Sequence, residues 1–247
     1  MCDLFGMSCQ AADRGVNSLR ALGGWSDWNP HGWGVAWYDQ DGRAQVRKAD
    51  EDGDGDFVAR KSTAFTRLIG EAESRLMVGH IRYKTCGDMC LENCHPFSRK
   101  VFERDWTFAH NGGIRGVERH PRSMGGTDSE QVFHEMMDEL ERYVNRPGFN
   151  GIYPGIKKAI RGVLARYSRD ITFNFLLSDG TTLYAYNHYP EKPLYASQRQ
   201  KGYGGAIVVS TGRLAHPDAG LSWRRVPADR LLAISDGRIH VLSNPLV

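Results

Sequence analysis

The sequence predicts an α+β protein in which antiparallel sheets are covered by helices. Two observations support this: three Asp-Gly pairs each separate two β-prone runs, and three stretches have the apolar spacing of amphipathic helices. The 247 residues include 6 Trp, 10 Tyr and 10 Phe, enough large side chains for a substantial core. No linker rich in Pro, Gly or Ser divides the chain, so we expect a single domain over residues 2–247.

The expected strands lie on either side of the Asp-Gly pairs, which are a strong short-range signal for a β-hairpin. Asp41-Gly42 separates residues 32–38 from 43–48, Asp179-Gly180 separates 173–178 from 181–186, and Asp236-Gly237 separates 231–235 from 238–242. Three further strands are predicted at 2–8, 75–82 and 106–110. Because the three hairpins are spread over the whole chain, antiparallel pairing is expected throughout.

Helices are predicted at 57–70, 129–143 and 151–167. In the second stretch the apolar residues recur with helical spacing on one face: Val132, Phe133, Met136, Met137 and Leu140. The acidic segment 50–56 precedes the first helix and suits a helix N-terminus. That segment is similar to a calcium-binding loop, but Lys61 stands where the twelfth-position Glu ligand is required, so we expect no calcium site.

Bulk composition excludes several classes of function. The formal net charge is +3, without the Lys/Arg block that binds nucleic acid. No apolar run reaches the roughly 18–20 residues that span a bilayer, and the start lacks a secretory signal. We therefore expect a soluble cytoplasmic protein that binds neither nucleic acid nor membrane, with its five cysteines as free thiols.

Cys2 is the most informative single residue. If Met1 is removed, Cys2 carries both a thiol and a free α-amine. These groups ordinarily titrate near ~8.5 and ~7.7–8.0, so the amine can take the thiol proton and later return it to a leaving group. The other interpretation is that Cys2 is simply a small residue after the start methionine.

Four short motifs accompany Cys2 at expected loops and element ends. They are Gly79-His80-Ile81-Arg82-Tyr83-Lys84-Thr85-Cys86-Gly87, Glu92-Asn93-Cys94-His95-Pro96-Phe97, Phe108-Ala109-His110-Asn111-Gly112-Gly113 and Gly126-Thr127-Asp128-Ser129-Glu130. Each has an ordinary structural explanation alone, such as a turn at Asn111-Gly112 or a helix cap at Thr127. Their combination is much more specific.

In order and spacing, these motifs over residues 2–130 resemble the class-II glutamine amidotransferases, which are N-terminal-nucleophile (Ntn) hydrolases. The resemblance implies a four-layer αββα sandwich, with two antiparallel sheets between helical layers. It also implies that Cys2, freed of Met1, attacks the γ-amide of glutamine or a related γ-glutamyl amide and forms a thioester. Glutamate is then released, together with ammonia or an amine.

The same resemblance assigns roles to the other motif residues. The Asn111 side-chain amide and the Gly112 backbone N–H would donate to the oxyanion. Arg82, helped by Thr85, would bind the substrate α-carboxylate, and Asp128 the α-ammonium. His95 is expected to stabilise its loop. Gly32 and Gly34 are expected to admit the substrate past the nucleophile.

One segment departs from the family pattern. Cys86, Cys90 and Cys94 form C-x₃-C-x₃-C directly before His95, and the family usually has His at position 86. A zinc or iron–sulfur site is one interpretation, but the spacing does not match the usual paired ligands. We expect three free thiols, with neither a metal nor a cofactor.

Several functions remain open from the sequence. No segment resembles the synthase domain that biosynthetic members append, so a separate synthase subunit accepts the ammonia, or the chain is a stand-alone γ-glutamyl amide hydrolase. A glutamine-sensing or regulatory binding module with little turnover is the main alternative to an enzyme. A metal-dependent hydrolase built on the cysteine segment ranks last.

Overall fold

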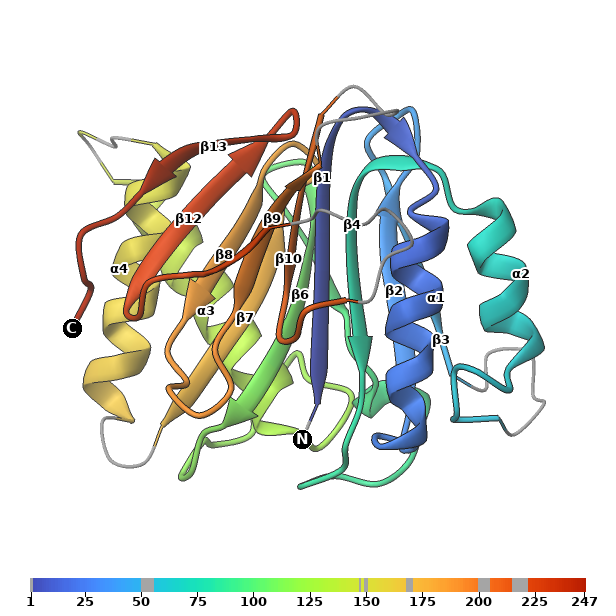
Figure 1. Ribbon diagram of the computed structural model, residues 1–247. Coiled ribbons are helices and arrows are strands. Elements are labelled where there is room, and N and C mark those ends of the chain that lie inside the picture. Colours follow the sequence, from blue (N-terminus) through green and yellow to red (C-terminus); the bar gives the residue numbers. More distant parts are fainter. Residues whose placement is uncertain are drawn as a thin grey trace.

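Two antiparallel sheets lie face to face between two pairs of helices (Figure 1), so the expected αββα sandwich is confirmed. The computed structural model describes residues 2–49, 56–146, 148, 151–167, 171–199, 205–214 and 222–247. The acidic segment 50–56, where we expect no calcium loop, lies outside the described residues except for Asp56. No described helix is both long and apolar enough to cross a membrane.

The first sheet has seven strands, with β1 at its centre. Its strands, in spatial order, are β11 (Trp223–Arg225), β9 (Tyr195–Arg199), β10 (Ala206–Ser210), β1 (Asp3–Asp13), β4 (Ser74–Ile81), β2 (Trp33–Tyr38) and β3 (Ala44–Lys48). The β1–β4 register pairs Asp3 with Ile81, so the beginning of β1 lies beside the end of β4.

The second sheet has six strands. In spatial order these are β13 (Arg238–Leu242), β12 (Arg230–Ser235), β8 (Leu183–Asn187), β7 (Thr172–Ser178), β6 (Arg104–Gly113) and β5 (Phe97–Val101). The three Asp-Gly hairpins join β2 to β3, β7 to β8 and β12 to β13, as predicted. At the second turn the buried Asp179 carboxylate accepts hydrogen bonds from the Thr181 and Thr182 N–H groups, which fixes that turn locally.

Two of the three expected helices match closely, α3 (Asp128–Val144) and α4 (Ile152–Arg166). The helix expected at 57–70 is shorter. It is α2 (Thr63–Glu71), because the Ser62 hydroxyl caps it by accepting the Phe65 N–H. Helix α1 (Val16–Gly24) was not predicted, nor were β5, β9, β10 and β11. Two short 3₁₀ turns, Trp25–Asp27 and Leu91–Asn93, complete the elements.

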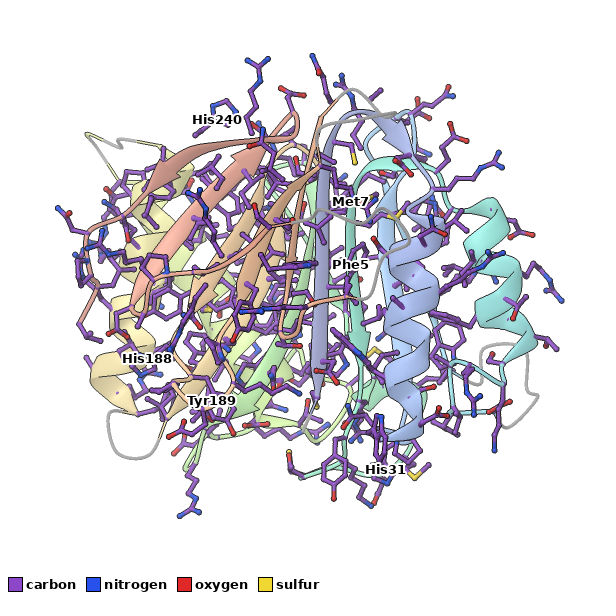
Figure 2. The ribbon with its side chains drawn as sticks, in the orientation of Figure 1. Phe5, Met7, His31, His188, Tyr189 and His240 are labelled. Carbon is purple, nitrogen blue, oxygen red and sulfur yellow. The ribbon has the colours of Figure 1, made fainter. Side chains whose placement is uncertain are left out.

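Apolar side chains fill three layers, one between the sheets and one beneath each helix pair. Strand β1 contributes to two of them by alternation. Phe5 and Met7 face α1 (Figure 2), whereas Leu4 belongs to the layer between the sheets. A side chain added at Gly6 would meet Leu176 and Leu183 of the second sheet. Even-numbered positions at the start of the chain therefore face the second sheet.

One edge of the sandwich gathers the predicted site residues. Strand β1 begins there, and β4 and β6 end there, at the lower edge of Figure 1. The loops that follow β4 and precede α3 meet at the same edge, because the Gly126 N–H donates to the Asn93 side chain at 2.8 Å.

Candidate active site

Cys2 lies directly before β1 and is held by Tyr83, two residues beyond the end of β4. The Tyr83 N–H donates to Cys2 Sγ at 3.2 Å, and the thiol donates to the Tyr83 carbonyl at 3.3 Å. The alternation of Leu4 and Gly6 places position 2 on the side that faces the second sheet. The thiol is thus fixed at the mouth of the layer between the sheets.

Burial raises the pKa of the Cys2 thiol above its ordinary value. The hydrogen bond from Tyr83 and the positive charge of Lys192 oppose this increase, and the Asp3 carboxylate adds to it. The thiol is therefore neutral near pH 7, and it needs a base before it can attack a carbonyl carbon.

Asn111 lies near the end of β6, on the face of that strand directed towards the first sheet. It shares this face with Ala109, which packs in the layer between the sheets. The residue is 1% exposed, yet its side-chain nitrogen Nδ2 makes no hydrogen bond to any described residue. A buried donor without a partner costs about 1–3 kcal/mol, so this atom is suited to receive a ligand oxygen.

Gly112 occupies a position where no side chain fits. Its φ is +156°, and an added Cβ would lie 1.9 Å from the Thr172 carbonyl oxygen of the neighbouring strand β7. The next residue, Gly113, has no atom within 4 Å of an added Cβ. The close approach of β7 at position 112 explains why glycine is required at one of these two positions and not at the other.

Arg82 is buried and holds the loop that follows β4. Its Nη1 donates to the Asp88 carbonyl at 2.8 Å, and its Nη2 to the Cys86 carbonyl at 2.9 Å. The guanidinium therefore has a structural partner besides the substrate carboxylate predicted for it. Its main chain pairs with Gly32, whose carbonyl accepts the Arg82 N–H at 2.7 Å.

Thr85, Cys86 and Asp128 line one cavity of about 690 Å³, together with Gly113 and Thr172. Asp128 is the first residue of α3, where a negative charge also suits the helix N-terminus. Its Oδ2 accepts the Ile114 N–H at 2.7 Å, and its Oδ1 accepts the Cys86 thiol at 3.3 Å. The described residues that line the cavity do not include Cys2, Arg82 or Asn111.

His95 belongs to a buried histidine cluster beneath the site. Its Nδ1 accepts the His110 N–H at 3.3 Å, and its ring centroid lies 4.1 Å from that of His80. Burial lowers the pKa of all three histidines, so they are neutral. An added Cβ at Gly34 would lie 2.1 Å from the His95 carbonyl oxygen. Gly34 thus packs against the His95 segment, and its predicted contact with substrate stays a prediction.

The three cysteines of the departing segment have separate surroundings. Cys86 contacts Asp128, the Cys90 sulfur accepts the Asn93 side-chain N–H at 3.2 Å, and the buried Cys94 thiol lies against Gly32. Among the described residues, no group of three or more His, Cys, Asp or Glu side chains is placed to hold a metal ion. The geometry gives no support to the zinc or iron–sulfur interpretation.

Sequence motifs did not indicate three further residues around Cys2: Asp3, Tyr83 and Lys192. Tyr83 lies inside the first motif but was not singled out. Lys192 is 190 positions from Cys2 in the chain, and its ammonium donates to the Cys2 carbonyl at 2.6 Å. No local spacing signals such a contact, because it depends on how the two sheets meet.

Comparison with known proteins gives the family. The sequence profile described as "Glutamine amidotransferases class-II" matches residues 1–215. The chain belongs to the class-II glutamine amidotransferases. The chain is 32% identical over 196 residues to the Escherichia coli (strain K12) protein YafJ, and the match covers 75% of this chain and 72% of YafJ. A 214-residue match to the Methanocaldococcus jannaschii protein MJ1515 is 30% identical and covers 83% of this chain and 56% of that protein.

Solved structures support the fold of this chain. The glutamine phosphoribosylpyrophosphate amidotransferase from B. subtilis superposes with a TM-score of 0.67 at 17% identity, over 98% of this chain and 49% of that one. A glutamine aminotransferase class-II domain protein from Silicibacter pomeroyi superposes with a TM-score of 0.62 at 19% identity, over 98% of both chains. The chain thus spans about half of one of these structures and nearly all of the other.

The pair Gly112 and Gly113 offers a matched test of this site. Gly112→Ala should lower the free energy of unfolding by about 1–3 kcal/mol, because the new Cβ collides with the Thr172 carbonyl and the strand must shift. Gly113→Ala should stay within about 0.5 kcal/mol of the wild type. Urea unfolding of the two variants measures the difference, and equal losses would contradict the close packing described at position 112.

Proposed function

We propose that this chain, once Met1 is removed, hydrolyses the γ-amide of glutamine or of a γ-glutamyl amide with Cys2 as nucleophile. The observation that carries the proposal is the unpartnered Asn111 Nδ2. It is a buried donor on the face of β6 that is directed towards the sheet at whose edge Cys2 lies. A hydrolase that forms an oxyanion needs a donor of this kind beside its nucleophile.

The first step joins the sulfur to the substrate. The Cys2 α-amine takes the thiol proton, directly or through a water, and Sγ attacks the γ-carbonyl carbon. The carbonyl oxygen becomes an oxyanion that accepts hydrogen bonds from the Asn111 side chain and the Gly112 N–H. The C–N bond then breaks as the α-ammonium returns the proton to the leaving nitrogen, and a thioester remains on Cys2.

The second step reverses the roles. Water attacks the thioester carbonyl, the α-amine accepts a proton from that water, and the same two donors stabilise the second oxyanion. Breaking the C–S bond releases glutamate and restores the thiol. The other product is ammonia from glutamine or an amine from a larger γ-glutamyl amide.

Recognition of the amino-acid end requires one cation and one anion. Asp128 supports binding of the α-ammonium, because its carboxylate lies at the wall of the cavity that Thr85 also lines. The Arg82 guanidinium has five N–H donors, and the loop carbonyls do not use all of them. The remaining N–H groups support binding of the α-carboxylate. Both contacts are part of the proposal, as are the roles predicted for His95 and Gly34.

Kinetics of two variants test the proposal. Cys2→Ala should release no glutamate above background from glutamine or any γ-glutamyl amide. Asn111→Ala should lower kcat by about 10²–10³-fold with a much smaller change in KM, because the donor acts mainly in the transition state. The matched control Asn244→Ala removes an exposed asparagine near the C-terminus and should leave both constants unchanged. Undiminished turnover by Cys2→Ala would refute the mechanism.

Calorimetry of glutamine binding by the same proteins, together with an assay for glutamate, distinguishes an enzyme from the glutamine-sensing alternative. An enzyme should consume glutamine and produce glutamate. A protein that binds glutamine tightly and yields no glutamate would be a regulatory module instead.

The pH dependence follows from the neutral thiol. Because burial raises the pKa of the Cys2 thiol, thiolate is scarce below pH 8 and the α-amine must act as base. The measured kcat/KM should therefore rise from pH 6 to pH 8, as the α-ammonium loses its proton near its ordinary pKa of about 7.7–8.0. A profile that is already flat at pH 6 would require a preformed thiolate and would contradict this assignment.

A further inference from the structure

Lys192 is a charged side chain beside the proposed nucleophile to which the mechanism assigns no role. It lies in the connection between β8 and β9, and its side chain is 20% exposed. Its Nζ lies 2.6 Å from the Cys2 carbonyl oxygen and 2.7 Å from Asp3 Oδ1. The Cys2 carbonyl and the Asp3 carboxylate both hold this ammonium, so its position is coupled to that of Cys2.

The Asp3 carboxylate that Lys192 meets is itself firmly held. Asp3 is buried, and it accepts a hydrogen bond from the Asn29 side chain at 2.6 Å and another from the Thr211 hydroxyl at 2.9 Å. Thr211 also accepts the Leu4 N–H at 3.0 Å, which ties this group to β1. Lys192 therefore contacts a fixed anion rather than a mobile surface carboxylate.

The main chain of Lys192 connects the same group to the second sheet. Its carbonyl accepts the Asn174 side-chain N–H at 2.7 Å, and Asn174 of β7 is the register partner of Asn111 in β6. The connection between β8 and β9 lies at the site edge. Figure 2 labels Tyr189 near that lower edge, and the Lys192 N–H donates to the Tyr189 carbonyl. One residue thus bridges the nucleophile in one sheet and the strand pair that carries the oxyanion donor in the other.

We propose that Lys192 is a positioning residue for the reaction: it fixes the first peptide plane of the mature chain and places a positive charge beside the Cys2 thiol. The proposal rests on the proposed function of Cys2. Free chain ends are mobile unless they are tied down. The Cys2 Cα, which carries the α-amine and the thiol side chain, directly precedes this peptide plane, so holding the Cys2 carbonyl limits the motion of base and nucleophile together.

The positive charge acts in the same direction on both groups. It lowers the pKa of the Cys2 thiol, as does the positive amino terminus, while Asp3 raises it. An adjacent ammonium also disfavours protonation of the α-amine, so more of that base is free near neutral pH. Lys192 therefore favours the thiolate and keeps the α-amine unprotonated, in addition to fixing the geometry of both groups.

Three variants of position 192 separate these effects. Lys192→Met removes both charge and donor, Lys192→Gln keeps a donor without charge, and Lys192→Arg keeps both. The matched control Lys61→Met removes an exposed lysine. Two readouts are measured on protein whose intact mass shows loss of Met1: kcat and KM with the best γ-glutamyl substrate, and the pH dependence of Cys2 alkylation by iodoacetamide, with Cys2 identified by peptide mapping.

Lys192→Met should lower kcat at least tenfold with KM changed less than threefold, and it should move the midpoint of Cys2 alkylation to higher pH. Lys192→Arg should restore most of the wild-type behaviour, and Lys61→Met should match the wild type. A folded Lys192→Met protein with an unchanged alkylation midpoint overturns the proposal, whatever its kcat. If Lys192→Met does not fold, the same criteria apply to Lys192→Gln. The alkylation readout needs no turnover, so a failure of the proposed function would not be mistaken for a failure of this inference.

Discussion

The pairing of β1 with β4 is the constraint on which the site depends. The register that joins Asp3 to Ile81 places Cys2 beside the residues that follow β4, where the Tyr83 main chain holds the thiol through both its N–H and its carbonyl. After β4 the chain continues into Arg82 and then into a loop in which Cys86 contacts Asp128. One antiparallel register therefore brings Cys2 next to the segment to which we assign substrate recognition.

The core around this edge stabilises groups that are unfavourable by themselves. Asn111 Nδ2 and both ring nitrogens of His80 are buried without a partner among the described residues. Each such group costs about 1–3 kcal/mol, which the three apolar layers of the sandwich can offset. In the proposed reaction, the Asn111 donor would be satisfied by the oxyanion. The histidine nitrogens contribute to a neutral, rigid support beneath it.

Local signals in the sequence predicted the elements whose structure is decided locally. The Asp-Gly hairpins and helix α3 were found where expected, because turn residues and a capped amphipathic face determine them. Helix α1 was missed because it begins after Gly15 without a side-chain cap and ends in two glycines. Strand β10 was missed because its partner β1 lies about 200 positions away. Lys192 was missed for the same reason. The packing of Gly34 against His95 could be seen only in the structure.

Covalent labelling tests the central claim most directly. A glutamine analogue with a diazomethyl ketone in place of the γ-amide should react once per chain, lose N₂ and leave its ketone joined to a sulfur through a CH₂ thioether. Intact-mass and peptide analysis should find a single adduct on Cys2, in chains that have lost Met1, and excess glutamine should slow its formation. An adduct on any other side chain, or equal labelling of chains that retain Met1, would contradict the account.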